Sequence, residues 1–326
     1  LRTRMSLAGQ IAVVTGASRG IGQGIALQLG AAGATVYVTG RAPGKSEAGG
    51  ALPTLEETAN EITARGGRGI AAYVDHSDVD DVKAFFDRVA KETSGQLDIL
   101  VNNAYSAVNY LLENAGKKFW ELEPEAWDQI NNVGLRNHYF CSVYAARLMV
   151  KAGGGLIVNI SSAGGLRYVF NVAYGAGKEA LDRMSVDMGI ELKTENVTVV
   201  SLWPGYVRTQ LVTSSLGEKV KSGGKDAKFA EKFLLGAEQG ESIEYAGKAV
   251  VALSSDPKRF SKTGRVLHTT DLGAEYKFLD VDGRQPASIR SFSTVLGALG
   301  YTTLAAYVPA WVCLPSWVLH ASANKF

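Results

Sequence analysis

The chain has 326 residues, enough for one large α/β domain or two small ones. Hydrophobic residues make up 46% and charged residues 20%, which is ordinary for a folded globular protein. The net charge of +2 gives no reason to expect a nucleic-acid partner, because DNA-binding domains carry clustered basic residues. The two cysteines, Cys141 and Cys313, have no metal-ligand spacing and indicate a reducing compartment without disulfides or a metal site. The apolar run Ile11–Val14 is too short for a signal-peptide core, so secretion is not expected.

Short apolar runs alternate with helical patterns from Gln10 to about Thr270. Several runs consist of Val, Ile and Leu, as expected for strands buried on both faces of a parallel sheet. The expected strands are 11–14, 35–39, 70–74, 97–101, 156–160, 197–202 and 265–268. Between the second and third, Thr54 and Glu57 form a capping-box pattern that begins a helix. This alternation predicts a doubly wound α/β fold with about seven parallel strands.

The first expected strand runs directly into a glycine-rich turn, Thr15-Gly16-Ala17-Ser18-Arg19-Gly20-Ile21-Gly22. A helical pattern follows the turn. Glycines at such a place let the backbone approach a pyrophosphate at the positive end of the helix. In the first βαβ unit of a sheet, this pattern predicts a dinucleotide-binding site.

The charge after the second expected strand indicates which dinucleotide binds. NAD sites usually offer a carboxylate to the ribose there, but this strand ends Thr39-Gly40-Arg41. Arg19 lies in the glycine turn, and two guanidinium groups at one spot would suit a 2′-phosphate through charge-assisted hydrogen bonds. We therefore expect NADP(H) as the cofactor. The alternative is that both arginines are solvated.

The segment Tyr174-Gly175-Ala176-Gly177-Lys178 places a tyrosine and a lysine one helical turn apart on the same face. A free tyrosine has a pKa of about 10, and a neighbouring ammonium lowers that pKa toward neutrality. A surface pair is the plain alternative. However, the segment follows an expected strand that ends in Ser161-Ser162, at the sheet edge where α/β proteins bind ligands. The pair therefore predicts a proton-transfer site.

Together these motifs resemble the short-chain dehydrogenase/reductase family, over about Leu7 to Leu272. The resemblance rests on the glycine turn, Asp75, Asn102-Asn103-Ala104, Ser161-Ser162, Tyr174-x-x-x-Lys178 and Pro204-Gly205-x-Val207-x-Thr209. It implies a Rossmann-type catalytic domain over 1–272, including a substrate lid at about 206–241, and a C-terminal extension over 273–326. Segments 127–136, 138–142, 201–205 and 280–284 also resemble one animal branch of the family.

The resemblance implies a role for each matching residue. Tyr174 would be the general acid in carbonyl reduction, Lys178 would lower its pKa and bind the nicotinamide ribose, and Ser162 would bind the substrate oxygen. The cofactor would contact Gly16, Ser18, Arg19, Ile21, Gly22, Arg41, Asp75, Asn102, Tyr174, Lys178, Val207 and Thr209. The family also implies a homo-oligomer, formed through the helices that carry Trp127 and Tyr174.

Two departures from the family pattern stand out. The family commonly spaces its serine and tyrosine thirteen apart, which fits Ser161, but it uses the second serine of the pair, so we choose Ser162. Many members carry an active-site asparagine where Gly134 stands, and its side chain holds the water of the proton relay. Because Gly134 has no side chain, we expect a backbone carbonyl freed by Gly134 to hold this water instead. Asn131 lies nearer this helix face than Asn132.

The family sequence Asn-Asn-Ala-Gly reads Asn-Asn-Ala-Tyr here, which puts Tyr105 near the nicotinamide mouth as pocket wall or as simple packing.

The C-terminal extension contains no Asp, Glu, Lys or Arg from Ser291 to Asn324, although it contains several Trp and Tyr residues. Such a stretch is a candidate for membrane attachment. Pro309 and Pro315 favour an in-plane or hairpin segment over one straight spanning helix. The alternative is packing over the substrate pocket or a partner. The branch resemblance implies the cytosolic face of the endoplasmic reticulum membrane, the alternative being the cytoplasm.

We therefore expect an NADPH-dependent reductase of lipophilic ketones or aldehydes, such as steroids, retinoids or xenobiotic carbonyls. One alternative is an alcohol dehydrogenase that works in the oxidative direction. The other is a catalytically weak cofactor-binding sensor, for which Gly134 is the main support.

Overall fold

The computed structural model describes residues 6–42, 54–222, 231, 234, 236–238, 240–298, 300–309, 312–315, 318 and 321. Part of the expected lid, and Trp311 and Trp317 of the extension, lie outside the described residues.

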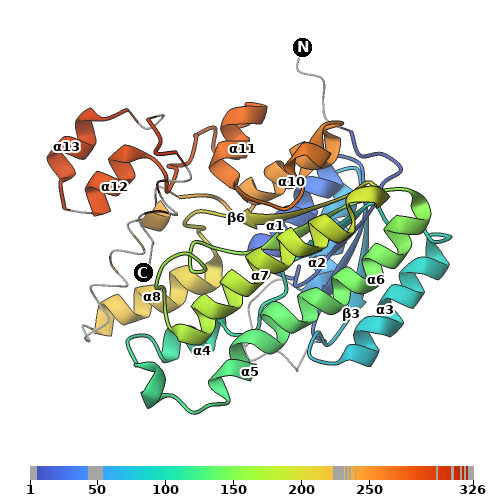
Figure 1. Ribbon diagram of the computed structural model, residues 1–326, viewed down its shortest axis with the longest axis horizontal. Coiled ribbons are helices and arrows are strands. Elements are labelled where there is room, and N and C mark those ends of the chain that lie inside the picture. Colours follow the sequence, from blue (N-terminus) through green and yellow to red (C-terminus); the bar gives the residue numbers. More distant parts are fainter. Residues whose placement is uncertain are drawn as a thin grey trace.

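Seven parallel strands form one sheet in the order β3-β2-β1-β4-β5-β6-β7, with the order reversing beside β1 (Figure 1). This confirms the predicted doubly wound α/β fold. The strands are β1 (Ile11–Val14), β2 (Thr35–Gly40), β3 (Arg68–Tyr73), β4 (Ile99–Asn102), β5 (Gly155–Ile160), β6 (Val197–Trp203) and β7 (Arg265–His268).

The start of β4 differs from the prediction. Leu97 is buried in the core, as its apolar side chain requires, but the strand begins only at Ile99. Asp98 joins the neighbouring strands just before β4: its amide donates to the Ile11 carbonyl oxygen at 2.9 Å, and its carboxylate accepts from the Ile11 amide at 2.7 Å.

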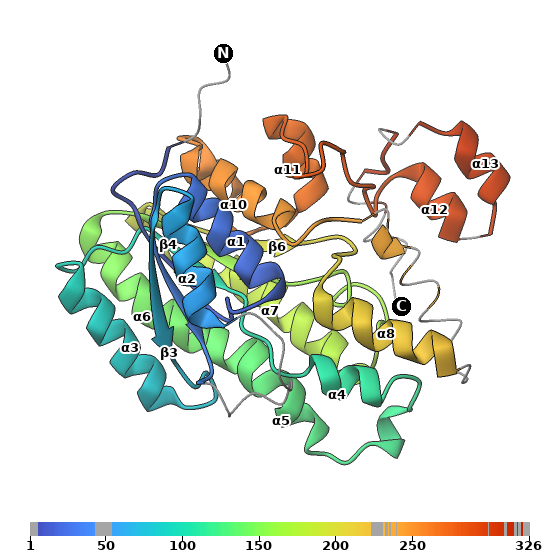
Figure 2. The same ribbon diagram turned by 180° about the vertical axis from the view of Figure 1, so that it is seen from behind.

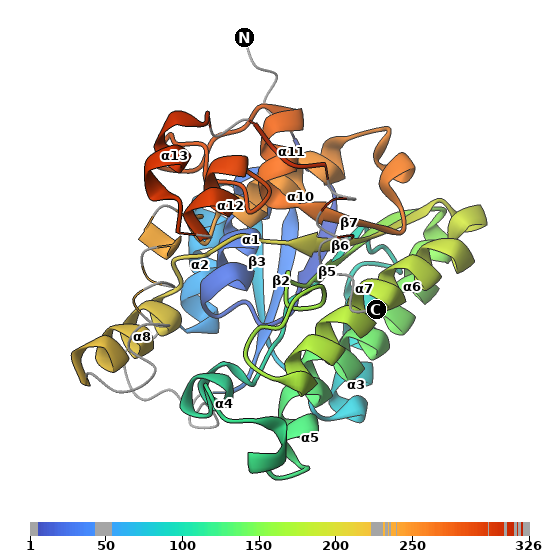
Figure 3. The same ribbon diagram turned by 60° about the vertical axis from the view of Figure 1, so that its left-hand side comes forward.

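Helices cover both faces of the sheet (Figures 2 and 3). One core packs the sheet against α1 (Gly20–Ala31), α2 (Leu55–Ala64) and α10 (Tyr245–Ser255). The other face carries α3 (Val79–Glu92), α6 (Asn137–Ala152) and α7 (Val172–Glu191). Thr54 accepts from the Glu57 amide and the Glu57 carboxylate accepts from the Thr54 amide, so the predicted capping box begins α2.

The other helices with described bounds lie beyond the carboxyl ends of the strands or away from the two helical layers (Figure 1). They are α4 (Val108–Glu113), α5 (Ala126–Asn131), α8 (Gln210–Ser222), α11 (Thr269–Tyr276), α12 (Phe292–Ala298) and α13 (Thr302–Tyr307). One turn of π-helix, Asn132–Arg136, joins α5 to α6. Within the described residues, no helix has both the length and the apolar character needed to cross a membrane.

Candidate active site

The glycine turn between β1 and α1 is a phosphate cradle in its geometry. Gly16 and Gly20 have φ values of +64° and +60°, which favour glycine. A Cβ at Gly16 would lie 2.7 Å from the Ala104 Cα, and one at Gly22 would overlap the Asn103 side chain. The first turn of α1 contains no acidic residue and has no side-chain cap, so its amide groups face the turn. These residues fit a dinucleotide phosphate.

Asn103 holds this cradle in place. Its side-chain amide donates to the carbonyl oxygens of Thr15 and Gly16, both at 2.9 Å, and its backbone amide donates to the Thr15 hydroxyl at 2.9 Å. The sequence motif contained Asn103, but the prediction named its neighbour Asn102 instead. Only the adjacency of β1 and β4 makes this role visible.

Asn102 itself is fully buried, and its side-chain amide donates to the His138 carbonyl oxygen, the Ser142 hydroxyl and the Asn159 side chain. These bonds fix the end of β4 to α6 and β5. The Asn102 side-chain amide is therefore used inside the protein, and a contact between Asn102 and the cofactor stays a prediction.

The Arg19 and Arg41 guanidinium groups act on each other. Burial lowers the pKa of Arg19, and the positive charge of Arg41 lowers it further. Two arginines without a described carboxylate partner leave positive charge at the end of β2, where the Thr39 carbonyl oxygen accepts from the Ala17 amide. The two arginines are close enough for the charge of Arg41 to act on Arg19, and their convergence on a 2′-phosphate stays a prediction.

Asp75 and the loop after β6 complete the expected cofactor residues. The half-buried Asp75 carboxylate accepts from the Ser77 amide and hydroxyl, and so turns the chain into α3. Thr209 approaches the glycine turn: a Cβ at Gly20 would lie 3.6 Å from its methyl group. Val207 is buried, and its carbonyl oxygen accepts from the Thr209 amide at 2.8 Å. A cleft of ≈ 540 Å³ runs between Arg19, Arg208 and Thr213 of α8, beside the phosphate cradle rather than at Tyr174.

Ser162 and Tyr174 meet at the carboxyl edge of the sheet. Their hydroxyl oxygens lie 2.7 Å apart. Ser161 points elsewhere, and its hydroxyl donates to the Lys178 backbone carbonyl oxygen at 3.3 Å. The geometry brings the Ser162 and Tyr174 hydroxyls together, whereas the Ser161 hydroxyl bonds the backbone of α7.

Lys178 is buried beside Tyr174, and its ammonium donates to the Ile160 carbonyl oxygen at 3.1 Å. Burial lowers the pKa of Lys178 to about 8, and the negative charge of Asp182 opposes this shift. Asp182 follows one helical turn later and accepts from the Trp203 indole at 3.0 Å and from the Ser201 hydroxyl. The i, i+4 spacing of Lys178 and Asp182 was a signal the prediction did not use.

The pKa of Tyr174 is raised, not lowered as was expected from the neighbouring Lys178. Burial raises the pKa of Tyr174, the hydrogen bond with Ser162 opposes this, and the charge of Asp182 adds to the rise. The phenol is therefore protonated at neutral pH, which suits a proton donor.

The π-turn, Asn132–Arg136, lies in the segment that was expected to hold the water of the proton relay. Asn131 is buried and donates to the Ala173 carbonyl oxygen of α7 at 3.1 Å, whereas Asn132 accepts from Arg136 at the surface. Gly134 packs against the Tyr105 ring. The structure thus puts Asn131 on the active-site side, and the water expected on a carbonyl freed by Gly134 stays a prediction.

The surroundings of Tyr174 are apolar. The Phe170 ring centroid lies 5.1 Å from that of Tyr174, and Phe170 has a φ of +60°, a strained backbone for this residue. Ala107, Leu111 and Ile130 pack in the same cluster, with Leu112 and Leu216 of α4 and α8 in the next. Among the described residues, no three His, Cys, Asp or Glu side chains come together as a metal site.

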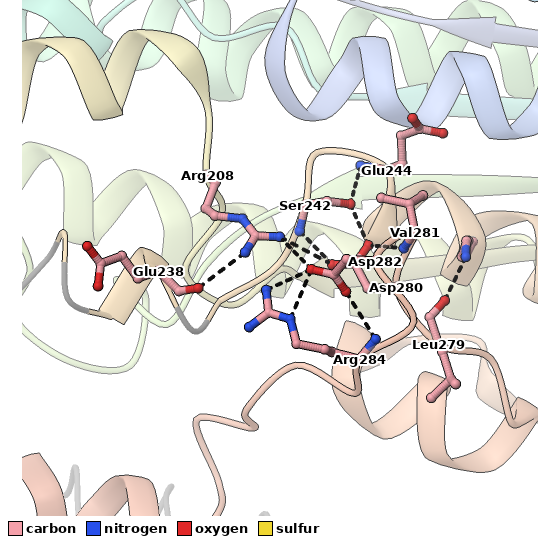
Figure 4. A network of polar contacts seen from close by, with 10 residues as sticks. Arg208, Glu238, Ser242, Glu244, Leu279, Asp280, Val281, Asp282 and Arg284 are labelled. Atoms are coloured by element: carbon pink, nitrogen blue, oxygen red, sulfur yellow. Dashed lines mark hydrogen bonds and ion pairs between the residues drawn. The ribbon is translucent and has the colours of Figure 1, made fainter.

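The C-terminal extension contacts both ends of the expected lid (Figure 4). Asp280 accepts from the Ser242 amide at 2.7 Å and lies 4.0 Å from the Arg208 guanidinium. Asp282 accepts from Arg208 at 3.1 Å. Arg208 lies near the start of the expected lid and Ser242 directly follows its end, so the extension contacts both ends of this segment, the base of the expected lid.

Glu241 lies buried at the same base. Its carboxylate accepts from the Gly205 amide at 2.8 Å and from the Thr269 hydroxyl. Burial raises the pKa of Glu241 to about 7, with a further contribution from the negative charge of Asp280. The sequence carried no signal for this buried carboxyl group.

The family model for short chain dehydrogenase matches residues 10–219. The chain therefore belongs to the short-chain dehydrogenase/reductase family of oxidoreductases, which bind a nicotinamide cofactor.

The chain is also similar to individual proteins and solved structures of this family. The chain is 47% identical to dehydrogenase/reductase SDR family member 1 of Homo sapiens, over 98% of both chains, which confirms the predicted branch. It is 33% identical to NADPH-dependent aldehyde reductase 2, chloroplastic, of Arabidopsis thaliana, over 67% of this chain and 81% of that protein. Among solved structures it is similar to a short-chain type dehydrogenase/reductase from Mycobacterium marinum, with a TM-score of 0.63 and 26% identity over 81% of this chain and 95% of that one.

Proposed function

We propose that the protein is an NADPH-dependent reductase of lipophilic ketones and aldehydes, with Tyr174 as the proton donor. The observation that carries the proposal is the placement of the Ser162 hydroxyl 2.7 Å from the Tyr174 hydroxyl, with Lys178 buried one helical turn away.

The chemistry assigns one task to each side chain. When bound, the cofactor supplies the hydride that is added to the carbonyl carbon. Tyr174 donates its hydroxyl proton to the carbonyl oxygen, giving the alcohol. Ser162 donates a hydrogen bond to the same oxygen and orients it. The raised pKa of Tyr174 keeps its proton available for reduction at neutral pH, and the Lys178 ammonium stabilises the phenolate left behind.

NADP(H) is supported by the positive charge at the end of β2. Arg19 and Arg41 act on each other's charge there, and the described residues 39–42 that end this strand include no carboxylate. A 2′-phosphate would relieve the repulsion between the guanidinium groups through charge-assisted hydrogen bonds. The named cofactor of the Arabidopsis relative agrees with this choice.

A lipophilic substrate is supported by the side chains around Tyr174. Phe170 and Leu111 belong to the apolar cluster around Tyr174, and Leu112 and Leu216 belong to the adjacent one. Apolar surroundings favour steroid, retinoid or aromatic xenobiotic carbonyls over charged metabolites, because a charged group would lose its hydration there without a partner.

We also propose that the extension attaches the protein to the cytosolic face of the endoplasmic reticulum membrane. Residues 291–324 carry no Asp, Glu, Lys or Arg, and α13 exposes Leu304 and Tyr307, the latter at 82%. Short helices with exposed aromatic residues suit in-plane contact with a bilayer surface. The test is to pellet the full chain with phosphatidylcholine vesicles and to compare it with a Leu304→Ser/Tyr307→Ser variant. Recovery of both proteins in the supernatant would contradict membrane attachment.

We further propose a homo-oligomer through α5 and α7.

The experiment for the catalytic proposal is NADPH consumption across a panel of steroid, retinoid and aromatic carbonyls, beside an NADH series. Turnover with NADPH supports the reductase. Faster turnover with NADH contradicts the cofactor assignment, turnover only of alcohols with NADP⁺ supports the oxidative alternative, and tight NADPH binding without turnover supports the sensor.

A further inference from the structure

Tyr105, in the loop after β4, contacts both members of the Tyr174–Lys178 pair. Its ring packs edge-to-face against the Tyr174 ring, with centroids 6.3 Å apart. The Lys178 ammonium nitrogen lies 5.0 Å from the centroid of the Tyr105 ring. A cation at this distance is attracted to the ring face, and more strongly when both are shielded from water. Lys178 is buried, so this contact acts on a poorly hydrated ammonium.

Gly134 makes room for this ring. A Cβ at position 134 would lie 2.5 Å from the Tyr105 Cε2 atom, closer than real contacts allow. Gly134 is buried within the π-turn, a helix irregularity often found at functional sites. The ring at 105 and the absence of a side chain at 134 are therefore complementary, and any larger residue at 134 must displace the ring from Lys178.

The hydroxyl of Tyr105 can be removed without removing the ring that faces Lys178. Its oxygen is buried and has no hydrogen-bond partner among the described residues. Burial raises the pKa of Tyr105 well above its usual value, with a further contribution from Tyr174, so the ring is neutral. Because a buried hydroxyl without a partner costs stability, a phenylalanine at this position should fold at least as stably and still present a ring to Lys178.

The other groups that face Lys178 are known from the structure. Asp182, one turn along α7, favours the charged ammonium, while burial opposes it. His138 of α6 responds to the Lys178 charge, and its own pKa is lowered to about 3 by burial, so it is neutral and adds no competing charge.

We propose that Tyr105 is a positioning residue of the active site, whose ring holds the charged Lys178 ammonium beside Tyr174 in the space that Gly134 leaves open. Its kinetic consequence rests on the proposed reductase function, but its main test does not.

The main test is the titration of Lys178 by NMR in the cofactor-free protein with ¹³C-labelled lysine, the signal being assigned with Lys178→Met. Tyr105→Leu removes the ring face and is expected to lower the Lys178 pKa by about one unit. Tyr105→Phe keeps the ring and is expected to leave that pKa in place. Tyr110→Leu, a half-buried tyrosine of the same cluster, is the matched control. An unmoved pKa in Tyr105→Leu overturns the proposal, and so does an equal shift in Tyr105→Phe.

A stability cycle tests the complementarity even if one variant is poorly folded. Gly134→Ala is expected to lower the melting temperature when Tyr105 is present and to have little further effect in a Tyr105→Ala background. Equal losses in both backgrounds would show that Gly134 and Tyr105 are independent, against the proposal.

The kinetic readout separates this inference from the proposed function. With any carbonyl that the enzyme reduces, Tyr105→Leu should move the alkaline limb of the pH profile about one unit lower, while Tyr105→Phe keeps it. If the wild-type protein reduces no carbonyl, the proposed function fails, and the NMR titration still decides the role of Tyr105.

Discussion

The hydroxyl of Ser162 lies 2.7 Å from the hydroxyl of Tyr174, while Ser161, one residue earlier, bonds the backbone of α7 instead. The turn between β5 and α7 therefore selects one serine of an adjacent pair. Ser162 also accepts from the Gly164 amide at 3.2 Å, so its orientation is fixed before substrate arrives. Such preorganisation means that the group need not reorient during the reaction.

Replacement of this serine should affect turnover more than binding. Ser162→Ala removes a hydrogen bond to the developing charge on the substrate oxygen and is expected to lower kcat on the order of 100-fold. Ser161→Ala is the matched control, with a much smaller loss. Steady-state kinetics with a carbonyl substrate measure both, and equal losses in the two variants would contradict the selection of Ser162.

The arginine pair should set cofactor preference. Each charge-assisted hydrogen bond to a phosphate contributes about 1.5–3 kcal/mol, so Arg19→Ala/Arg41→Ala is expected to weaken NADPH binding on the order of 100-fold or more. NADH binding should change little, because NADH lacks the 2′-phosphate. Fluorescence titration with both cofactors gives the comparison, and Arg88→Ala, at an exposed arginine of α3, controls for the loss of a surface positive charge. Parallel losses for both cofactors would refute the assignment.

Glu241 should make stability depend on pH at the base of the lid. Its folded pKa of about 7 is above the ordinary value of 4.5, so the folded state binds more protons between those values and stability falls as pH rises through the window. Glu241→Gln keeps the acceptor for Gly205 and Thr269 without the charge. It is expected to be more stable than wild type by about 1–3 kcal/mol at pH 8, and not at pH 4.

Urea unfolding of both proteins at several pH values measures the difference. Because His76 and His138 have lowered pKa values and act in the opposite direction in both proteins, only the difference between wild type and variant isolates Glu241. A difference that is independent of pH would contradict the buried carboxyl group.

The extension should support the lid through Asp280. Asp280→Ala removes the acceptor for Ser242 and is expected to cost about 1–3 kcal/mol of stability. It should also raise KM more than it lowers kcat, since the lid base contacts no reacting atom. Asp282→Asn, whose ion pairs with Arg208 and Arg284 are partly exposed, is the control and should cost less stability than Asp280→Ala, because exposed ion pairs contribute little. An unchanged KM in Asp280→Ala would contradict the prediction that the extension supports the lid.

The sequence predicted the sheet because its strands are apolar runs between turn motifs, and these patterns are local. It predicted the motif residues for the same reason, since Gly16, Tyr174 and Lys178 stand at short, characteristic spacings. It missed Asn103 because the hydrogen bonds of that residue cross from β4 to β1, and it missed Glu241 because nothing local marks a buried carboxyl group.

Tyr105 and Gly134 show the limit of local patterns most clearly. Each was noted separately as a departure from the family pattern, but their contact depends on a π-turn that no periodicity announces. The pKa of Tyr174 was expected to fall beside Lys178 but is raised, because the phenol is buried.

The most direct test of the central claim is NADPH oxidation by Tyr174→Phe with the best carbonyl of the panel. The account predicts a loss of at least on the order of 100-fold in kcat, with NADPH binding retained, because only the proton donor is removed. Turnover by Tyr174→Phe at the wild-type rate would contradict the account.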